Sequence, residues 1–342
     1  MGTRVLVGMS GGVDSSVALL LLQKAGYECV GATLSMTGEE DTSGAAALAE
    51  RMGVEHHVVP VGEQFRACVM EDFVRVYEAG GTPNPCVTCN RTVKFPALAA
   101  CADRLGCTCI ATGHYARTGA GESGRTLLRK GADEKKDQSY FLWAVPRSLL
   151  SRTLFPLGDM TKAEVRALAE REGLPNASRR DSQDICFVPE GDHARFIRDF
   201  TGKSYPPGDM TDTVGNLLGR HRGLIAYTVG QRRGLGVAAG EPLYVKEKNV
   251  RENRLVLGTE TALYSQRLTA RHMNLLSMES LPEELSCSAR VRYSRREEPC
   301  IVRSLPEGGA EVVFAQPQRA VTPGQSLVLY DGDIVIGGGI IG

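Results

Sequence analysis

The chain has 342 residues, a length that predicts two or three domains of ordinary size. Apolar residues make up 42% of it and charged residues 23%, which excludes a disordered, collagenous or coiled-coil protein. Basic and acidic side chains balance at 40 each, so no overall positive field indicates nucleic acid. No apolar run approaches the roughly 18 residues of a membrane helix, and the N-terminus lacks a signal-peptide pattern. We therefore expect a cytoplasmic protein without a membrane partner.

The first 115 residues alternate between strand and helix patterns. Short apolar runs predict buried strands, and apolar residues at helical spacing predict the helices between them. The predicted strands are 4–9, 28–34, 54–59 and 108–112, and the predicted helices include 16–24, 43–52 and 96–105. Repeated strand–helix–strand units favour a Rossmann-like α/β domain with a parallel sheet. Helical patterns continue to about residue 200, so we expect a first domain over 1–200 that binds its ligand at the carboxyl ends of the strands.

Two smaller domains are predicted to follow. Residues 201–265 are punctuated by Gly and Pro and contain short strands, which is typical of a small α+β domain. Within 203–254, nine Lys and Arg side chains outnumber five acidic ones, which makes this segment either a phosphate-binding surface or an ordinary solvated one. Residues 266–342 contain short strands separated by turns and predict an antiparallel β-barrel. We expect the run 337–339, three glycines, to form a terminal turn.

A glycine-rich loop joins the first predicted strand to the first predicted helix, with the sequence GMSGGVDSS over 8–16. Gly11 and Gly12 lack Cβ atoms, so backbone N–H groups can approach a phosphate, and the helix N-terminus adds free donors. Asp14 would repel a phosphate directly, which indicates a role through Mg²⁺ or a backbone contact. The spacing matches neither the Walker loop nor the dinucleotide fingerprint. A plain tight turn is the alternative.

Ten cysteines are too few for a disulfide scaffold in a chain of this size. Cys86 and Cys89 form a C-x-x-C, and Cys186 lies far along the chain. This constellation is open to several interpretations: a zinc site, a redox dithiol, iron–sulfur ligands or core packing. A four-cysteine zinc site would need Cys107 and Cys109, whose spacing inside a predicted buried strand disfavours it.

Several strings of the sequence resemble known families. SGGVDS in the loop resembles the signature of PP-loop ATP pyrophosphatases, which cut ATP between the α- and β-phosphates. Further strings, in chain order, resemble the tRNA-specific 2-thiouridylases: GMSGGVDSSVA (8–18), TPNP (82–85), ATGHYAR (111–117), KDQSYFLW (136–143), DSQDICF (181–187), YTVGQRRGLGV (227–237) and PGQS (323–326). They span nearly the whole chain, so the likeness is not confined to the nucleotide loop.

The resemblance implies both a fold and a reaction. A PP-loop domain, a small central domain and a C-terminal β-barrel would hold the anticodon stem-loop of tRNA. Sulfur would replace the C2 oxygen of the wobble uridine after adenylation by ATP with Mg²⁺. The residues implied for the nucleotide are Gly8, Met9, Ser10, Gly11, Gly12, Val13, Asp14, Ser15, Leu34 and Gly113, with Asp14 also implied as catalytic. The residues implied at tRNA and its target base are Asn84, Pro85, Cys86, His114, Lys136, Asp137, Gln138, Tyr293, Ser294 and Gln325.

Some side chains near these positions have open roles. His114 is a candidate general base by position, with an RNA contact or a structural role as alternatives. Tyr115, Tyr140 and Phe141 are candidates for stacking on bases. Core packing is the stronger expectation for Phe141 and for Trp143.

Cys89 and Cys186 match the two cysteines that the family uses in catalysis. The position of Cys86 is Asp in the best-known members, and the change creates the C-x-x-C. The resemblance therefore implies two ways of presenting sulfur. In the first, which we favour, Cys86, Cys89 and Cys186 ligate a [4Fe–4S] cluster whose fourth iron binds exogenous sulfide. In the second, Cys186 carries a persulfide and Cys89 closes a disulfide with it. Sulfur would come from a donor or carrier protein, or from free sulfide.

Two rival functions are also compatible with parts of the sequence. Another PP-loop enzyme, such as an amide ligase for a small substrate, would explain the loop but neither the cysteines nor the barrel. An RNA-binding scaffold with a structural metal would explain the cysteines but not the loop. A thiouridylase consumes ATP in a reaction that depends on tRNA, and neither rival does.

Overall fold

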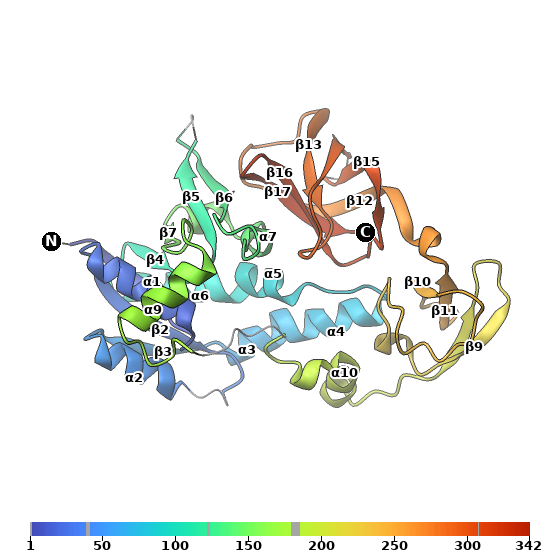
Figure 1. The fold of residues 1–342 in the computed structure, drawn as a ribbon, viewed down its shortest axis with the longest axis horizontal. Helices are drawn as coiled ribbons and strands as arrows, with labels where there is room; N and C mark the ends of the chain where they lie inside the picture. Colours follow the sequence, from blue (N-terminus) through green and yellow to red (C-terminus); the bar gives the residue numbers. More distant parts are fainter. Residues whose placement is uncertain (1, 39–41, 122–123, 179–184, 307) are drawn as a thin grey trace.

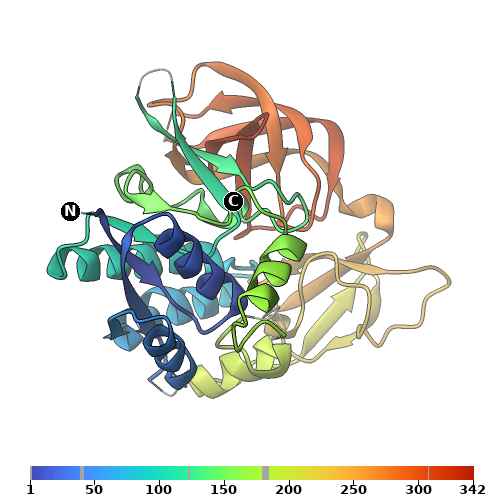
Figure 2. The ribbon, with the colours of Figure 1, turned by 60° about the vertical axis from the view of Figure 1, so that its left-hand side comes forward.

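The computed structural model describes residues 2–38, 42–121, 124–178, 185–306 and 308–342. Figures 1 and 2 show three folded parts: an N-terminal domain on one side, and a barrel and a smaller central domain next to each other on the other side. In Figure 1 the helix labelled α4 extends from the N-terminal domain toward the central domain, and the chain returns from there to α5. Within the described ranges, no helix is long and apolar enough to cross a membrane.

The N-terminal domain is built on a five-stranded parallel sheet, which confirms the predicted α/β architecture. Its strands, in spatial order, are β3 (His56–Pro60), β2 (Glu28–Ser35), β1 (Arg4–Gly8), β4 (Cys109–Ala111) and β7 (Thr153–Leu154). β1 lies at the centre, and its residues Val5, Leu6 and Val7 are completely buried. Because every pairing in this sheet is parallel, the carboxyl ends of the strands meet at one edge, where ligands of such sheets bind.

Helices cover both faces of this sheet because successive β1 side chains point to opposite sides. Val5 and Val7 pack with the helices α1 (Val13–Lys24), α2 (Ser43–Arg51) and α9 (Lys162–Arg171). Leu6 packs on the other face with two long helices that follow β3. α9 begins with a capping box, in which Thr161 Oγ1 accepts from the Glu164 N–H and the Glu164 carboxylate accepts from the Thr161 N–H at 2.7 Å.

The two long helices each contain a π-helical turn. The first comprises α3 (Gly62–Phe65), η1 (Arg66–Met70) and α4 (Glu71–Glu78), and the second comprises α5 (Pro85–Cys89), η2 (Asn90–Lys94) and α6 (Phe95–Arg104). Pro96 in the second helix has no N–H to donate to the Thr92 carbonyl. Gln64 Nε2 of the first helix donates to that carbonyl instead, at 2.6 Å, which joins the two helices. π-turns are frequent at functional sites, and this one begins directly after Cys89.

A hairpin that the sequence analysis did not predict links the N-terminal domain to the barrel. β5 (Ala116–Ala120) and β6 (Thr126–Lys130) pair antiparallel, and Arg129 of β6 pairs with Ile334 of β17 in the barrel. The remaining elements of this region are α7 (Ser139–Leu142), α8 (Arg147–Leu150), η3 (Pro189–Gly191) and α10 (His193–Thr201). The hairpin therefore makes one continuous sheet out of parts of the first and last domains.

The central domain is a four-stranded sheet around a small core. Its strands, in spatial order, are β10 (Tyr244–Asn249), β11 (Arg254–Gly258), β8 (Gly208–Thr211) and β9 (Leu217–His221). The short 3₁₀ turns η4 (Leu224–Ala226) and η5 (Glu260–Leu263) flank it. Met210, Tyr227 and Val245 are among its buried core residues. Such a small core gains stability from packing against its neighbours.

The last part is a closed antiparallel β-barrel, as predicted. Around the barrel the strands are β12 (Tyr264–Leu275), β15 (Ala310–Arg319), β14 (Glu298–Ser304), β13 (Glu284–Arg290), β16 (Ser326–Asp331) and β17 (Ile334–Ile341), and β12 pairs with β17 to close it. The predicted terminal turn at 337–339 is wrong, because these glycines lie within β17. Glycine is required there by close packing: a Cβ on Gly338 would lie 2.7 Å from Trp143 Cδ2 and 2.5 Å from the Leu327 carbonyl oxygen.

Gly338→Ala is expected to lower the free energy of unfolding by about 1–3 kcal/mol. Trp143 is 1% exposed and cannot move away from β17 without opening the contact between the N-terminal domain and the barrel. Urea unfolding midpoints measure the effect. Gly240→Ala is the matched control, since no atom lies within 4 Å of a Cβ added there. Equal midpoints for the two variants would contradict the close packing.

Candidate active site

The glycine-rich loop lies at the carboxyl edge of the sheet, between β1 and α1. Gly11 has a φ of +70°, which favours glycine, and no side chain caps the start of α1. Ser15 Oγ donates to the Gly12 carbonyl at 3.0 Å and accepts from the Ser10 N–H at 3.2 Å, which holds the loop closed. The loop therefore presents the backbone N–H groups and the positive helix end that bind phosphates.

The carboxylate of Asp14 is compensated by a lysine that the sequence analysis missed. Lys162 Nζ, at the first position of α9, donates to both Asp14 oxygens at 2.8 and 2.9 Å, and Tyr115 Oη donates to one of them at 2.7 Å. Lys162 is 8% exposed and Tyr115 is 2% exposed, so solvent screens the group only weakly. The sequence pattern of the capping box, with Thr161 as N-cap, indicates that α9 begins at Lys162. No local pattern indicates that Lys162 pairs with Asp14.

Other residues fix the loop from two sides. Gly113, just after β4, lies against it, because a Cβ there would be 2.8 Å from both the Asp14 carbonyl carbon and the Ser15 nitrogen. Asn176 Nδ2 donates to the Gly11 carbonyl at 3.0 Å, and no local sequence signal marked this residue. Two more implied nucleotide contacts, Met9 and Leu34, lie at the ends of β1 and β2, with Met9 buried and Leu34 half-buried.

The three candidate cysteines come from two segments. Cys86 and Cys89 lie on α5, with Cys89 buried and Cys86 exposed. Cys186 is exposed, and the first four residues of its DSQDICF string lie outside the described residues. Phe187 anchors this segment in an aromatic cluster, with its ring centroid 5.5 Å from that of Phe65 and 5.2 Å from that of Phe73. Those two rings belong to the long helix that packs beside α5.

The three thiols lie within electrostatic reach of one another. Burial raises the pKa of Cys186 to about 11, and its neighbours Cys86 and Cys89 raise it as well. Burial raises the pKa of Cys89. Loss of solvent around the thiol also raises the pKa of Cys86, although part of this residue is exposed. Lys94 of η2 opposes all three shifts. All three thiols are therefore protonated at neutral pH in this state, and Lys94 is their common cation.

The thiol set suits iron–sulfur ligation chemically, although the thiols are not gathered as metal ligands. Three soft sulfur donors are typical of iron–sulfur or zinc sites. Among the described residues, no group of three or more His, Cys, Asp and Glu side chains is placed to hold a metal ion. Metal ligation by these thiols would displace their protons. Cys107 is buried in the hydrophobic core of the N-terminal domain, beside Arg4 and Cys101.

His114 connects the thiol group to the nucleotide loop. Its Nδ1 shares a 2.8 Å hydrogen bond with Thr112 Oγ1, and its ring stacks on Phe95 at 5.9 Å between centroids. Burial lowers the pKa of His114 well below its usual value, and Lys94 lowers it further, so the imidazole is neutral at pH 7. Gly113 touches the loop, and His114 is influenced by the same lysine as the thiols. The loop and the thiols are therefore linked through Gly113, His114 and Lys94.

Several residues implied at the RNA lie where the barrel meets the N-terminal end of α5. Gln325 Nε2, in the barrel, donates to the carbonyls of Thr82 and Pro83 at 2.9 and 3.1 Å. Tyr293 and Ser294, also in the barrel, are exposed. This junction contains backbone, amide and aromatic groups that can contact a single-stranded loop.

The buried tyrosines correct one sequence prediction. Tyr115 and Tyr140 are 2% and 0% exposed, so the expectation that they stack on bases is wrong for this structure. Tyr140 Oη instead donates to the Ser326 carbonyl of the barrel at 2.9 Å and is hydrogen-bonded by the Asn84 side chain. Trp143 is buried, as expected.

Asp137 is buried as well, in a contact between the N-terminal domain and the barrel. Its Oδ2 lies 3.2 Å from Arg290 Nη1 of β13, and its Oδ1 accepts from the N–H groups of Gly131 and Ser139, each at 3.1 Å. Its neighbours Lys136 and Gln138 are half-buried. In this structure Asp137 therefore holds its loop to the barrel.

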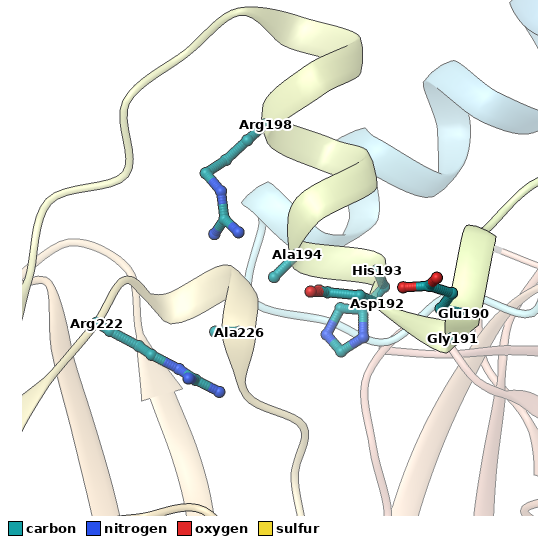
Figure 3. Close-up of a pocket in the computed structure, with 8 residues that line it drawn as sticks. All are labelled: Glu190, Gly191, Asp192, His193, Ala194, Arg198, Arg222 and Ala226. Carbon is teal, nitrogen blue, oxygen red and sulfur yellow. The ribbon is translucent and has the colours of Figure 1, made fainter.

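A cavity of about 340 Å³ lies between the start of α10 and the central domain (Figure 3). Arg198 of α10 and Arg222 after β9 both extend into it, from different walls (Figure 3). Glu190, Asp192 and His193 form a third wall, close along the chain to Cys186. Two guanidinium groups, one from α10 and one from the segment after β9, thus face one space.

Comparisons with known proteins agree with this architecture. Three family models match in chain order: the tRNA methyl transferase HUP domain over 3–190, the tRNA methyl transferase PRC-barrel domain over 194–259 and the aminomethyltransferase beta-barrel domain over 265–341. The fold and the loop thus define a nucleotide-binding protein of the HUP class with two accessory β-domains.

The tRNA-specific 2-thiouridylase MnmA of Lachnoclostridium phytofermentans is 43% identical over 353 aligned positions, with 99% of both chains covered. MnmA of Acetivibrio thermocellus is 45% identical over 354 positions, with the same coverage. The chain belongs to the tRNA-specific 2-thiouridylase family, which confirms the resemblance found in the sequence.

Proposed function

We propose that this chain is a tRNA-uridine 2-sulfurtransferase that uses ATP to replace the C2 oxygen of the wobble uridine with sulfur. The uracil O2 attacks the α-phosphate of ATP, pyrophosphate leaves, and the base carries AMP at C2. A sulfur nucleophile then attacks C2, and the bond between C2 and the AMP oxygen breaks. The contact of Gly113 with the nucleotide loop, together with the electrostatic effect of Lys94 on both His114 and the three thiols, is the observation that carries this proposal.

The loop and its neighbours support the adenylation half of the reaction. We assign ATP to Gly8 through Ser15, with further contacts at Leu34 and Gly113. The N–H groups of the loop and the positive end of α1 would bind the phosphates, and Mg²⁺ would reduce their charge. Lys162 compensates the Asp14 carboxylate, so that it does not repel the triphosphate, and places a positive charge beside the reacting phosphates.

The RNA is proposed to lie across the two β-domains and α5. The target uridine must leave the base stack to reach ATP. Tyr293, 37% exposed, has its ring centroid 4.5 Å from that of Phe141, and this pair offers an aromatic surface for an unstacked base. Arg198 and Arg222 in the cavity of Figure 3 are candidates for backbone phosphates, which give salt-dependent affinity.

We assign the presentation of sulfur to Cys86, Cys89 and Cys186. Their raised pKa values make them poor nucleophiles until a metal displaces the proton or a nearby cation lowers the pKa. These three thiols would hold a [4Fe–4S] cluster, which would supply an open iron for exogenous sulfide. The alternative is a persulfide on Cys186 that Cys89 resolves, which gives Cys86 no role. With tRNA and ATP as substrates, we place the reaction in the cytoplasm, with sulfide or a carrier protein as donor.

ATP-dependent thiolation of unmodified tRNA tests the proposed function. The chain, reconstituted anaerobically with iron and sulfide, is expected to form 2-thiouridine together with equal amounts of AMP and pyrophosphate. Asp14→Ala is expected to lose activity by on the order of 10²-fold or more, because the loop then lacks the group that orders Lys162. Digestion of the RNA and mass spectrometry measure the product. Thiolation without ATP, or full activity of Asp14→Ala, would contradict the proposal.

The same assay separates the two rival functions. Full ATP–pyrophosphate exchange in the absence of tRNA would favour another PP-loop ligase. Binding of tRNA without any ATP consumption would favour an RNA-binding scaffold.

A further inference from the structure

The segment that leads into α5 is held by both β-domains. Residues 80–84, here named the strap, join α4 to the helix that carries Cys86 and Cys89. The strap also contains Asn84, which is implied at the target base. Because α5 starts directly after the strap, any shift of the strap moves the two cysteines with it.

A buried lysine holds the strap from the central domain. Lys248 Nζ, on β10, donates to the Gly81 carbonyl at 3.0 Å and to the Tyr227 carbonyl at 3.1 Å. It lies 5.2 Å from the ring centre of Tyr77, near the end of α4, and the residue is 7% exposed. Burial lowers the pKa of Lys248 to about 8, and within the described residues no carboxylate pairs with it. A buried cation is costly, so its use to join two backbone carbonyls of separate domains indicates a specific role.

The barrel holds the strap from the other side. The Thr82 N–H donates to the Pro323 carbonyl at 2.8 Å, and Gln325 Nε2 donates to the next carbonyls of the strap. Gly81 and Gly324 permit this approach: a Cβ on Gly81 would lie 2.8 Å from the Pro323 oxygen, and one on Gly324 would lie 3.1 Å from the Thr82 oxygen. The strap is therefore confined between the two β-domains.

We propose that Lys248 is a positioning residue for sulfur transfer: by holding the Gly81 carbonyl it fixes the strap, and with it Cys86 and Cys89, relative to the central domain. This inference rests on the proposed function, in which the β-domains bind the RNA and the thiols act on its base. Attack at C2 tolerates little displacement, since a shift of about 1 Å can cost on the order of 10²-fold in rate. Lys248 thus couples the RNA-binding part of the molecule to the thiols.

Lys248→Met tests this inference, because methionine keeps the unbranched apolar stem and donates no hydrogen bond. Single-turnover sulfur transfer is expected to slow by about tenfold or more, while tRNA-dependent ATP–pyrophosphate exchange and the KM for tRNA change by less than about twofold. In the RNA-free protein, iodoacetamide is expected to alkylate Cys86 and Cys89 several-fold faster, as measured by mass spectrometry, since α5 is less tightly held. Lys246→Met, at an exposed position of the same strand, is the matched control and is expected to keep wild-type rates of alkylation and of sulfur transfer at saturating tRNA.

Wild-type rates of sulfur transfer and alkylation in Lys248→Met would overturn the inference. Parallel losses of exchange and sulfur transfer, with a lower thermal midpoint, would also overturn it, because they indicate a merely structural role. If the wild-type chain forms no 2-thiouridine, the proposed function fails, and the alkylation rates alone decide the role of Lys248. Should Lys248→Met not fold, Lys248→Gln, which keeps a shorter hydrogen-bond donor, is the second variant. It is expected to slow sulfur transfer less than Lys248→Met and to retain ATP–pyrophosphate exchange.

Discussion

Lys162→Met is expected to abolish ATP–pyrophosphate exchange, with a loss on the order of 10²–10³-fold. The Lys162 ammonium contacts both oxygens of Asp14, at 2.8 and 2.9 Å, in the first turn of the nucleotide helix. Without it, an uncompensated carboxylate would stand beside the triphosphate of ATP. Solvent would screen this repulsion only in part, because the Asp14 side chain is 33% exposed. Exchange of labelled pyrophosphate into ATP, in the presence of tRNA, measures the effect.

Lys24→Met is the matched control for this prediction. Lys24, at the end of α1, pairs with Glu172 just after α9 at 2.6 Å, so its loss removes an ion pair between the same two helices but away from the loop. Its exchange rate is expected to equal that of the wild type. The double variant Asp14→Asn, Lys162→Met is expected to stay far below wild type, because the proposed function also places the lysine beside the phosphates. Full recovery in the double variant would reduce the role of Lys162 to charge compensation.

Serine in place of Cys89 or Cys186 is expected to lower 2-thiouridine formation by on the order of 10³-fold or more, with pyrophosphate exchange retained. Both thiols are assigned to the second half-reaction, and neither lies in the nucleotide loop. Cys68→Ser, in the first long helix, is the control and is expected to remain active. Equal loss of exchange in the Cys89 and Cys186 variants would contradict the division into two half-reactions.

Cys86→Ser distinguishes the two ways of presenting sulfur. With a three-cysteine cluster, the reconstituted wild-type chain is expected to bind about four irons, and Cys86→Ser to lose most of the iron and of the thiolation activity. Iron and acid-labile sulfide analysis under anaerobic conditions, alongside the thiolation assay, provides the measurement. Full activity of Cys86→Ser, with inactive Cys89→Ser and Cys186→Ser, would instead establish the persulfide route.

Local features of the fold were predictable because they depend on neighbours along the chain. The nucleotide loop, 8–16, directly follows a buried strand and has three glycines and a helix start within nine residues. The capping box of Thr161 and Glu164 likewise involves residues only three positions apart. The order of a parallel-sheet domain, a central domain and a barrel follows from the changing periodicity of the sequence.

Features that depend on packing were predicted wrongly or not at all. The glycines at 337–339 suit a turn by composition, but they lie within β17, where a Cβ on Gly338 would meet Trp143 and one on Gly337 would meet the Asn274 carbonyl. The β5–β6 hairpin gains its partner only from the barrel, through Arg129 and Ile334. Tyr140 has an aromatic ring and a polar hydroxyl, as a base-stacking residue on a surface would have. The barrel nevertheless buries it completely.

By itself, the sequence determined the class of nucleotide loop, the three candidate thiols and the family of the chain. Only the tertiary structure decided which distant groups act together. Lys162 meets Asp14 across 148 positions of the chain, and Lys94 of η2 lies within electrostatic reach of Cys186. Spacing patterns in the sequence indicate only contacts between residues of the same strand or helix. Such pairs depend instead on how helices pack over the sheet, and this is set by the complementary shapes of buried side chains throughout the core.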